Sequence, residues 1–275
     1  MQLLTKKLIR SLLKPRAADS HKGNHGHALL ITGSRGKMGA AVISSRACLR
    51  TGAGLLSVLV PAKLGTIIQT AVPEAMLCND EKEGMDLSAY SGIGIGPGLS
   101  TSKENLKLVT AIIESSQVPL VIDADALNII SLHKTLLMKL RADTILTPHP
   151  KEFDRLFGVH STEQERIKTA VKTSKEYNVI IVLKGHKTVI IHHDKLCKNT
   201  TGNAGLAKGG SGDALTGIIT SFLAQGYTPF TAASLGVYMH GLAADITLRT
   251  QSTESMLISD VIENLGQAFK VINKD

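Results

Sequence analysis

The chain has 275 residues, of which 43% are hydrophobic and only 3% aromatic, and its formal net charge is +8 at pH 7. This length and composition favour a single α/β domain over residues 1–275 with an aliphatic core, and the positive charge favours an anionic partner. No run of apolar residues is long enough to span a membrane, and the basic residues neither form a block nor alternate with aromatic residues, so we expect neither a membrane nor a nucleic acid as partner.

The first 16 residues are basic and contain no acidic residue. They allow two interpretations: a transit peptide, or a short amphipathic helix docked on the domain with Leu3, Leu4, Leu8 and Leu12 on one side. We favour the docked helix, because residues with possible chemical roles follow almost at once. The three cysteines are far apart, which indicates reduced thiols and a cytoplasmic protein.

Residues 28–32 form a short apolar run that predicts a buried strand, and a glycine-rich turn at 33–39 then opens a helix reaching about residue 50. This turn lacks the spacing of a dinucleotide-binding fingerprint. Its small residues, Ala40 among them, suit either close approach of a flat ligand or tight helix–strand packing.

Three histidines at 21, 25 and 27 precede the strand, and we expect a solvated loop there rather than a metal site.

Further strands and helices are predicted to alternate along the rest of the chain. The expected strands are 52–60, 75–78, 92–95, 119–122, 144–146, 179–183 and 189–191. The expected helices are 62–70, 103–116, 125–130, 152–157, 162–177, 228–250 and 253–272, and an acidic polar loop is expected at 79–86. This pattern predicts an α/β fold with a mostly parallel sheet and helices on both faces.

Distinctive residues follow four of these strands, at the edge where ligands bind in such folds. A Gly-Pro-Gly turn ends at Gly98. Asp123 and Asp125 suit a cation or a sugar hydroxyl, although Asp125 could instead cap the next helix. His149 lies between two prolines, which restrict its backbone and favour a functional ring. The loop that begins with Lys184 suits a phosphate, a ribose or a plain hairpin turn.

The most distinctive stretch is 203–217, where three glycines precede a helix whose apolar residues recur at helical spacing. Backbone N–H groups at such a helix start form an anion site. Asp213 lies inside this turn. We expect the helix end to keep its carboxylate ionised, so that it can take a proton from a hydroxyl group beside a bound phosphate. The plainer alternative is that Asp213 only caps the helix. The spacing is not that of a Walker loop.

Seven motifs occur in order along the chain, and through them it closely resembles the ADP-dependent NAD(P)H-hydrate dehydratase family, whose fold is ribokinase-like. They are HKG (21–23), GS with MGAA (33–34, 38–41), GIGPG (94–98), DADALN (123–128), LTPHP (146–150), LKG (183–185) and GLAKGGSGD (205–213). The resemblance covers roughly residues 20–270. The chain departs from the family pattern in two places: no proline precedes the glycine of the Met38-Gly39 turn, and Ser211 replaces a common threonine.

The resemblance implies an enzyme that repairs the S-epimer of NADH or NADPH hydrate by removing water at the expense of ADP, giving AMP and phosphate. Asp213 would be the general base, and the amides of Gly210, Ser211 and Gly212 would hold the transferring phosphoryl group. It further implies a hydrate pocket and adenine-nucleotide contacts. Their residues would be Ala40, Gly98, His149 and Asp213 for the hydrate, and Lys184, Gly185, His186, Lys187, Thr188 and Gly212 for the nucleotide.

The resemblance also implies Mg²⁺ to balance the phosphates, with no dedicated protein metal site, a homotetramer, and a separate NAD(P)H-hydrate epimerase acting alongside. A small-molecule kinase of the same fold, such as a hydroxymethylpyrimidine-type kinase that uses ATP, is the alternative. Its base and anion site would be the same, but the walls at 147–150 and 96–98 favour the dehydratase.

Overall fold

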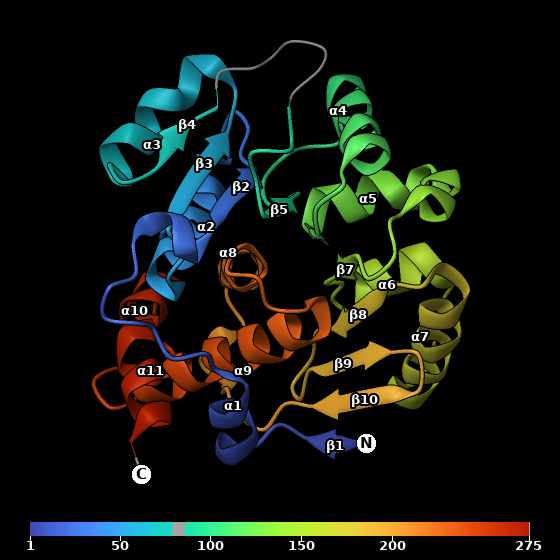
Figure 1. Cartoon of the computed structure of the whole chain (residues 1–275). Helices are drawn as coiled ribbons and strands as arrows, with labels where there is room; N and C mark the ends of the chain where they lie inside the picture. Colours follow the sequence, from blue (N-terminus) through green and yellow to red (C-terminus); the bar gives the residue numbers. More distant parts are fainter. Residues whose placement is uncertain (79–85, 275) are drawn as a thin grey trace.

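The computed structural model describes residues 1–78 and 86–274, and its strands form one ten-stranded sheet in the order β1-β10-β9-β8-β7-β6-β5-β2-β3-β4 (Figure 1). The strands are β1 (Gln2–Leu3), β2 (His27–Ile31), β3 (Leu55–Leu59), β4 (Met76–Leu77), β5 (Gly92–Ile95), β6 (Leu120–Ile122), β7 (Ile145–Leu146), β8 (Ile180–Leu183), β9 (Val189–His192) and β10 (Lys195–Lys198).

Seven of these strands, from β4 across β2 to β8, pair in parallel. Strand β9 is antiparallel to both β8 and β10, and β1 is parallel to β10. The chain runs outward from β2 in both directions, to β3 on one side and to β5 on the other. The loops after β2 and β5 therefore meet at a switch point, where Gly33 N donates to Pro97 O (2.8 Å).

Helices cover both faces of the sheet (Figure 1). On one face lie α4 (Lys103–Ser115), α5 (Ala124–Leu132), α6 (Pro150–Phe157) and α7 (Glu163–Tyr177). On the other lie α1 (Lys6–Leu12), α2 (Met38–Thr51), α3 (Gly65–Ala71), α8 (Ser211–Ala224), α9 (Pro229–Thr247), α10 (Ile258–Glu263) and α11 (Leu265–Asn273). The α/β prediction, with a mostly parallel sheet between two helical layers, is confirmed.

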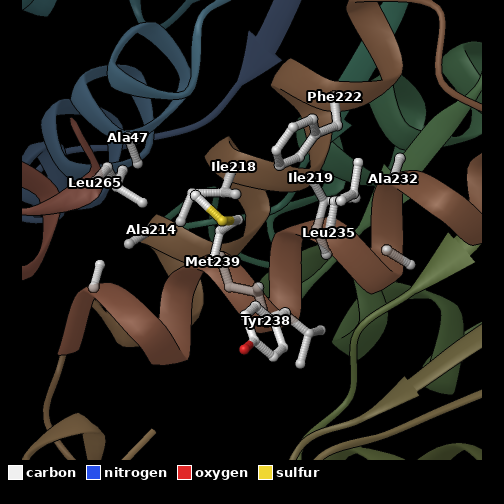
Figure 2. Close-up of a cluster of buried hydrophobic side chains, with 14 of the residues drawn as sticks. Ala47, Ala214, Ile218, Ile219, Phe222, Ala232, Leu235, Tyr238, Met239 and Leu265 are labelled. Carbon is white, nitrogen blue, oxygen red and sulfur yellow. The ribbon is translucent and has the colours of Figure 1, made fainter. Parts of the chain in front are cut away.

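Side chains alternate along the central strands between two cores. Val121 of β6 packs with α8 and α9, whereas its neighbours Leu120 and Ile122 pack with α4 and α5. Strand residues are apolar on both faces because helices bury both, which is typical of parallel sheets. Figure 2 shows how side chains of α8, including Ile218, Ile219 and Phe222, gather against those of α9.

The structure corrects two predictions near the chain ends. The N-terminal segment does contain a docked helix, but Leu3 belongs to strand β1 and is 53% exposed, while Ile9 of α1 is buried. The helix starts late because the Thr5 side chain caps it by accepting from Leu8 N. The single helix expected at 253–272 is two helices, α10 and α11, which meet at Asn264.

Residues 79–85 of the acidic loop expected at 79–86 lie outside the described residues. No helix in the described part of the chain combines the length and the apolar character that a membrane crossing requires.

Helix α8 lies so close to α2 that position 217 needs a glycine. A Cβ on Gly217 would overlap the backbone carbonyl group of Ser44. A carbonyl group inside a packed helix cannot turn aside as the tip of a side chain can, so the two helices would have to separate.

We therefore expect Gly217→Ala to lower the free energy of unfolding by at least about 2 kcal/mol, or the Tm by roughly 4 °C or more. Gly266→Ala in α11 is the matched control, because a Cβ there meets no atom within 4 Å. Alanine is favoured over glycine inside helices, so this control should be slightly stabilised. Thermal unfolding followed by circular dichroism measures both changes. An unchanged Tm for Gly217→Ala would contradict the close packing of α2 and α8.

Candidate functional site

Three neighbouring strands end at one cavity of about 820 Å³. Asp123 follows β6, His149 lies in the loop after β7, and Lys184 follows β8. The segment 199–209, the first turn of α8 and part of α9 complete the wall. Of the residues predicted for the site, the cavity is lined by His149, Lys184, Gly185, His186, Thr188, Ser211, Gly212 and Asp213. The volume is within the usual range for a small-molecule site.

A largely buried ion pair lies in the wall of this cavity. Lys184 Nζ is 2.8 Å from Asp123 Oδ1, and Thr216 Oγ1 of α8 donates to Asp123 Oδ2, also over 2.8 Å. Burial opposes the charge of Lys184, but the carboxylates of Asp123 and Glu152 outweigh that effect and raise its pKa. Lys184 therefore keeps its positive charge at neutral pH.

The two acidic residues after β6 have different environments. Asp123 is 1% exposed, whereas the Asp125 carboxylate accepts from Ser100 N (2.8 Å) and lies 3.1 Å from Lys37 Nζ. The interpretation of Asp125 as a cap for the next helix is wrong, because its side chain links α5 to the loops after β2 and β5 instead.

His149 is the N-cap of α6, with Pro150 in the first helical position. Its Nδ1 accepts from the backbone N–H groups of Lys151 (3.1 Å) and Glu152 (3.3 Å), and Glu152 Oε2 accepts from His149 N (2.8 Å). Since Nδ1 is an acceptor, the neutral ring carries its proton on Nε2. Burial and then Lys184 lower the pKa of His149, so the ring is neutral at pH 7.

The turn before α8 has the geometry expected of an anion site. Gly210 has a φ of 92°, which favours glycine, and α8 begins at the next residue. Within the described part of the chain, the backbone N–H groups of Gly210, Gly212 and Asp213 donate to no acceptor, while Ser211 N has only a long contact of 3.4 Å with Lys208 O. Four neighbouring amides are thus nearly free to bind an anion.

Asp213 is partly buried in this turn, and its side chain does not cap α8. Burial, followed by the negative charge of Asp123, raises its pKa to about 6, although Lys184 acts in the opposite direction. The sequence predicts that the helix end keeps this carboxylate ionised; burial instead shifts its pKa upward, but with a pKa of about 6 the carboxylate is still mostly ionised at pH 7.

Residues 184–188 connect β8 to the antiparallel strand β9, so the loop is both a hairpin connection and part of the cavity wall. Lys184 N donates to Pro148 O (2.9 Å), which ties the loop to the end of β7. Lys187 is not among the residues that line the cavity.

Ala40 and Gly98 form a separate group at the switch point. A Cβ on Gly98 would lie 2.9 Å from Ala40 Cβ, and Ser34 Oγ donates to Gly98 O (2.7 Å). Neither residue lines the cavity described above. Both Asp123 in the cavity and Asp125 near this group raise the pKa of Asp213, so Asp213 lies within electrostatic reach of both regions. Gly210 also lies off the cavity wall, against Ile43 of α2.

The cavity contains residues that sequence reasoning did not select, notably Glu152, Asn199 and His240. Glu152 had a visible signal, since it follows His149 by three residues in a capping-box arrangement. His240 lies in the apolar helix α9, where nothing in the pattern distinguishes it. Its pKa falls to about 4, because of burial and then Lys184.

No group of three or more His, Cys, Asp or Glu side chains that could hold a metal ion occurs among residues 1–78 and 86–274. The rings of His25 and His27 instead contact the hydroxyl groups of Ser20 (3.0 Å) and Ser57 (2.9 Å).

Comparison with known proteins identifies the family. A family model described as NAD(P)H-hydrate dehydratase matches residues 28–267. The chain is 34% identical to an ADP-dependent (S)-NAD(P)H-hydrate dehydratase of Bacillus subtilis, over 97% of this chain and 98% of that protein. It is 35% identical to a bifunctional NAD(P)H-hydrate repair enzyme of Moorella thermoacetica, over 100% of this chain and 55% of that protein. The chain thus spans about half the length of such bifunctional relatives.

Solved structures indicate the same family. An ADP/ATP-dependent NAD(P)H-hydrate dehydratase of Bacillus subtilis, co-crystallized with ATP/Mg²⁺, superposes with a TM-score of 0.88 at 31% identity over 99% of both chains. A ribokinase-like superfamily protein of Enterococcus faecalis has the same TM-score and identity over 98% of this chain and 96% of that chain. The fold is therefore ribokinase-like, and the chain belongs to the NAD(P)H-hydrate dehydratase family.

Proposed function

We propose that this protein removes water from the S-epimer of NADH or NADPH hydrate, using ADP as phosphoryl donor and releasing AMP and phosphate. The observation that carries the proposal is the position of Asp213. A carboxylate with a pKa of about 6 lies inside a turn of nearly free amides, on the wall of a cavity of about 820 Å³. Such a carboxylate is ionised at neutral pH and can accept a proton beside a bound phosphate.

The chemistry explains why the site needs both features. Hydroxide is a poor leaving group, so the hydroxyl group on C6 of the reduced ring is first phosphorylated. Asp213 takes the hydroxyl proton while the oxygen attacks the terminal phosphorus of ADP, and AMP leaves. The amides of Gly210, Ser211 and Gly212 would stabilise the charge on the phosphoryl oxygens, which is the main task in phosphoryl transfer. The ring nitrogen then expels phosphate, and loss of a proton from the neighbouring carbon restores the double bond.

We assign two subsites on either side of Asp213. Ala40, Gly98 and His149 would contact the hydrate, and the neutral His149 ring can donate a hydrogen bond from Nε2. The hairpin residues Lys184, Gly185, His186, Lys187 and Thr188, together with Gly212, would contact the adenine nucleotide. The support for this arrangement is that most of these residues line one cavity, and that Ala40 and Gly98 meet at the adjoining switch point.

Mg²⁺ fits this site through charge rather than through a set of protein ligands. The acidic residues Asp123, Glu152 and Asp213 line the cavity together with the basic residues Lys184 and Lys208, so negative charge is in excess by one when all of them are ionised. Adding the phosphates of ADP increases that excess. The ion would be held mainly by phosphate and water oxygens, as Mg²⁺ commonly is, and would offset the repulsion between the nucleotide and these carboxylates.

We further propose that residues 1–275 act as one catalytic domain whose activity is coupled to that of an NAD(P)H-hydrate epimerase, since the chain matches about half of relatives that are named bifunctional NAD(P)H-hydrate repair enzymes. A cytoplasmic location is consistent with the three free cysteines, Cys48, Cys78 and Cys197. A homotetramer is the assembly that the family resemblance implies, and light scattering of the purified protein measures it.

The direct test is to incubate the protein with NADH hydrate and NADPH hydrate, each with ADP or ATP and Mg²⁺, and to follow the absorbance of the reduced nicotinamide ring. We expect the absorbance to return as AMP and phosphate, or ADP and phosphate, are released. The absence of recovery with either nucleotide would exclude the repair activity. Nucleotide consumption that leaves a stable phosphorylated alcohol would instead indicate a kinase.

Replacing Asp213 tests the general base. We expect Asp213→Asn to retain nucleotide binding, measured by calorimetry, and to lose turnover by at least ~10²-fold, because the amide cannot accept the hydroxyl proton. Turnover equal to that of the wild type would remove Asp213 from the mechanism.

The raised pKa of Asp213 makes both activity and stability depend on pH. We expect kcat/KM to rise as pH increases through about 6, where Asp213 ionises. The folded pKa lies above the usual value near 4, so ionisation lowers the stability of the folded protein by up to about 3 kcal/mol above pH 6. Asp213→Asn should therefore raise the Tm at pH 8 but leave it nearly unchanged at pH 4. The same difference in Tm at both pH values would contradict this linkage.

A further inference from the structure

The ammonium group of Lys184 has hydrogen-bonding capacity that the described residues do not use. It can donate three hydrogen bonds. Among the described residues, Asp123 Oδ1 at 2.8 Å is its acceptor, while Glu152 Oε2 lies 3.8 Å away, beyond hydrogen-bond range. Lys184 lines the cavity with 19% of its side chain exposed. Two N–H groups therefore remain for a ligand.

This ammonium group lies directly beside the anion turn. A Cβ on Gly212 would lie 3.2 Å from Lys184 Nζ and 3.3 Å from Asp123 Oδ2. Glycine at position 212 thus lets the ion pair approach the first turn of α8. A phosphoryl group bound by the amides of this turn would be within reach of the lysine side chain.

The ion pair is anchored on both sides. Asp123 is 1% exposed and accepts from Thr216 Oγ1 of α8 through its second oxygen. Because Asp123 follows β6 and Lys184 follows β8, the carboxylate fixes the ammonium group between the sheet edge and the helix. A flexible lysine side chain is held in one place without losing its charge.

We propose that Lys184 is a catalytic residue that binds the oxygens of the transferring phosphoryl group, and that Asp123 is the positioning residue that holds it there. The proposal rests on the proposed function, and it goes beyond a contact to the bound nucleotide by assigning Lys184 to the group in transit. As the hydroxyl oxygen bonds to phosphorus and the bond to the AMP oxygen breaks, Lys184 donates hydrogen bonds and transfers no proton. The hydroxyl proton goes to Asp213.

Four variants test the proposal. Lys184→Met alone would leave Asp123 as a buried, unpaired carboxylate and endanger folding, so Lys184→Met is combined with Asp123→Asn. Lys184→Arg retains the charge, and Asp123→Asn alone removes the anchor. Lys175→Met is the control, because it removes an exposed lysine paired with Asp194 on the surface.

We expect the double variant to lose ~10²- to 10³-fold in kcat, as when one donor to a developing charge is removed, with a much smaller change in the KM for ADP. The kcat of Lys184→Arg should be at least about tenfold higher than that of the double variant, because arginine keeps a cationic donor at this position. Lys175→Met should match the wild type. A double variant with unchanged kcat and a raised KM would show that Lys184 only binds the nucleotide, which would overturn the proposal.

The pH profile distinguishes positioning from a purely structural role of Asp123. Asp123→Asn should lower kcat by roughly tenfold through the displaced lysine. It should also move the acidic limb of kcat/KM to lower pH, because the negative charge of Asp123 raises the pKa of Asp213. The double variant removes one charge of each sign, so its acidic limb should move less. An Asp123→Asn variant with both kcat and the acidic limb unchanged would contradict the positioning role.

A second measurement does not depend on the hydrate. Inorganic phosphate is titrated into protein saturated with AMP and followed by calorimetry. The double variant should bind phosphate at least about tenfold more weakly than the wild type or Lys175→Met, because a charge-assisted hydrogen bond is lost. Equal phosphate affinity, or a wild type that binds no phosphate, would overturn the assignment of Lys184. A wild type that binds phosphate but restores no NADH would refute the proposed function alone.

Discussion

The closeness of helix α8 to its neighbours is the constraint on which this site depends. Its interior is wholly buried, and glycine at position 217 lets it touch the backbone of α2. On the sheet side, glycine at positions 92 and 94 of β5 leaves room for the backbone and side chains of the same helix. Close contacts on two sides hold this helix in place, so the donors at its first turn are held relative to the strand ends.

The protonation states of the charged residues in the site depend on a competition between burial and neighbouring charges. Burial favours the neutral forms of both Asp213 and Lys184, whereas the pairing of Lys184 with Asp123 keeps the ammonium group charged, and the repulsion from Asp123 raises the pKa of Asp213 further. The result is one group that stays cationic and another that titrates close to neutrality. Pairs of groups whose titration is separated in this way are characteristic of acid–base sites.

Much of this arrangement could be predicted from the sequence, because its signals are local. Glycines before a periodic apolar segment mark the start of α8, and polar residues after apolar runs mark the ends of β6, β7 and β8. The parts that could not be predicted depend on packing between distant segments. Nothing near Asp125 indicates that Lys37 and Ser100, which are distant in sequence, are among its partners, and His240 has no local signal. The pKa of Asp213 likewise depends on burial by the whole fold.

Strand β9 runs opposite to its neighbours, and this has a consequence for how the family can diverge. A parallel connection after β8 would need a long crossover with its own helix, but the antiparallel return lets residues 184–188 close as a short hairpin at the rim of the cavity. Exposed hairpin tips accept insertions and deletions that buried elements do not. A change in the length of this one segment would therefore reshape the mouth of the cavity and leave the hydrophobic layers beneath it intact.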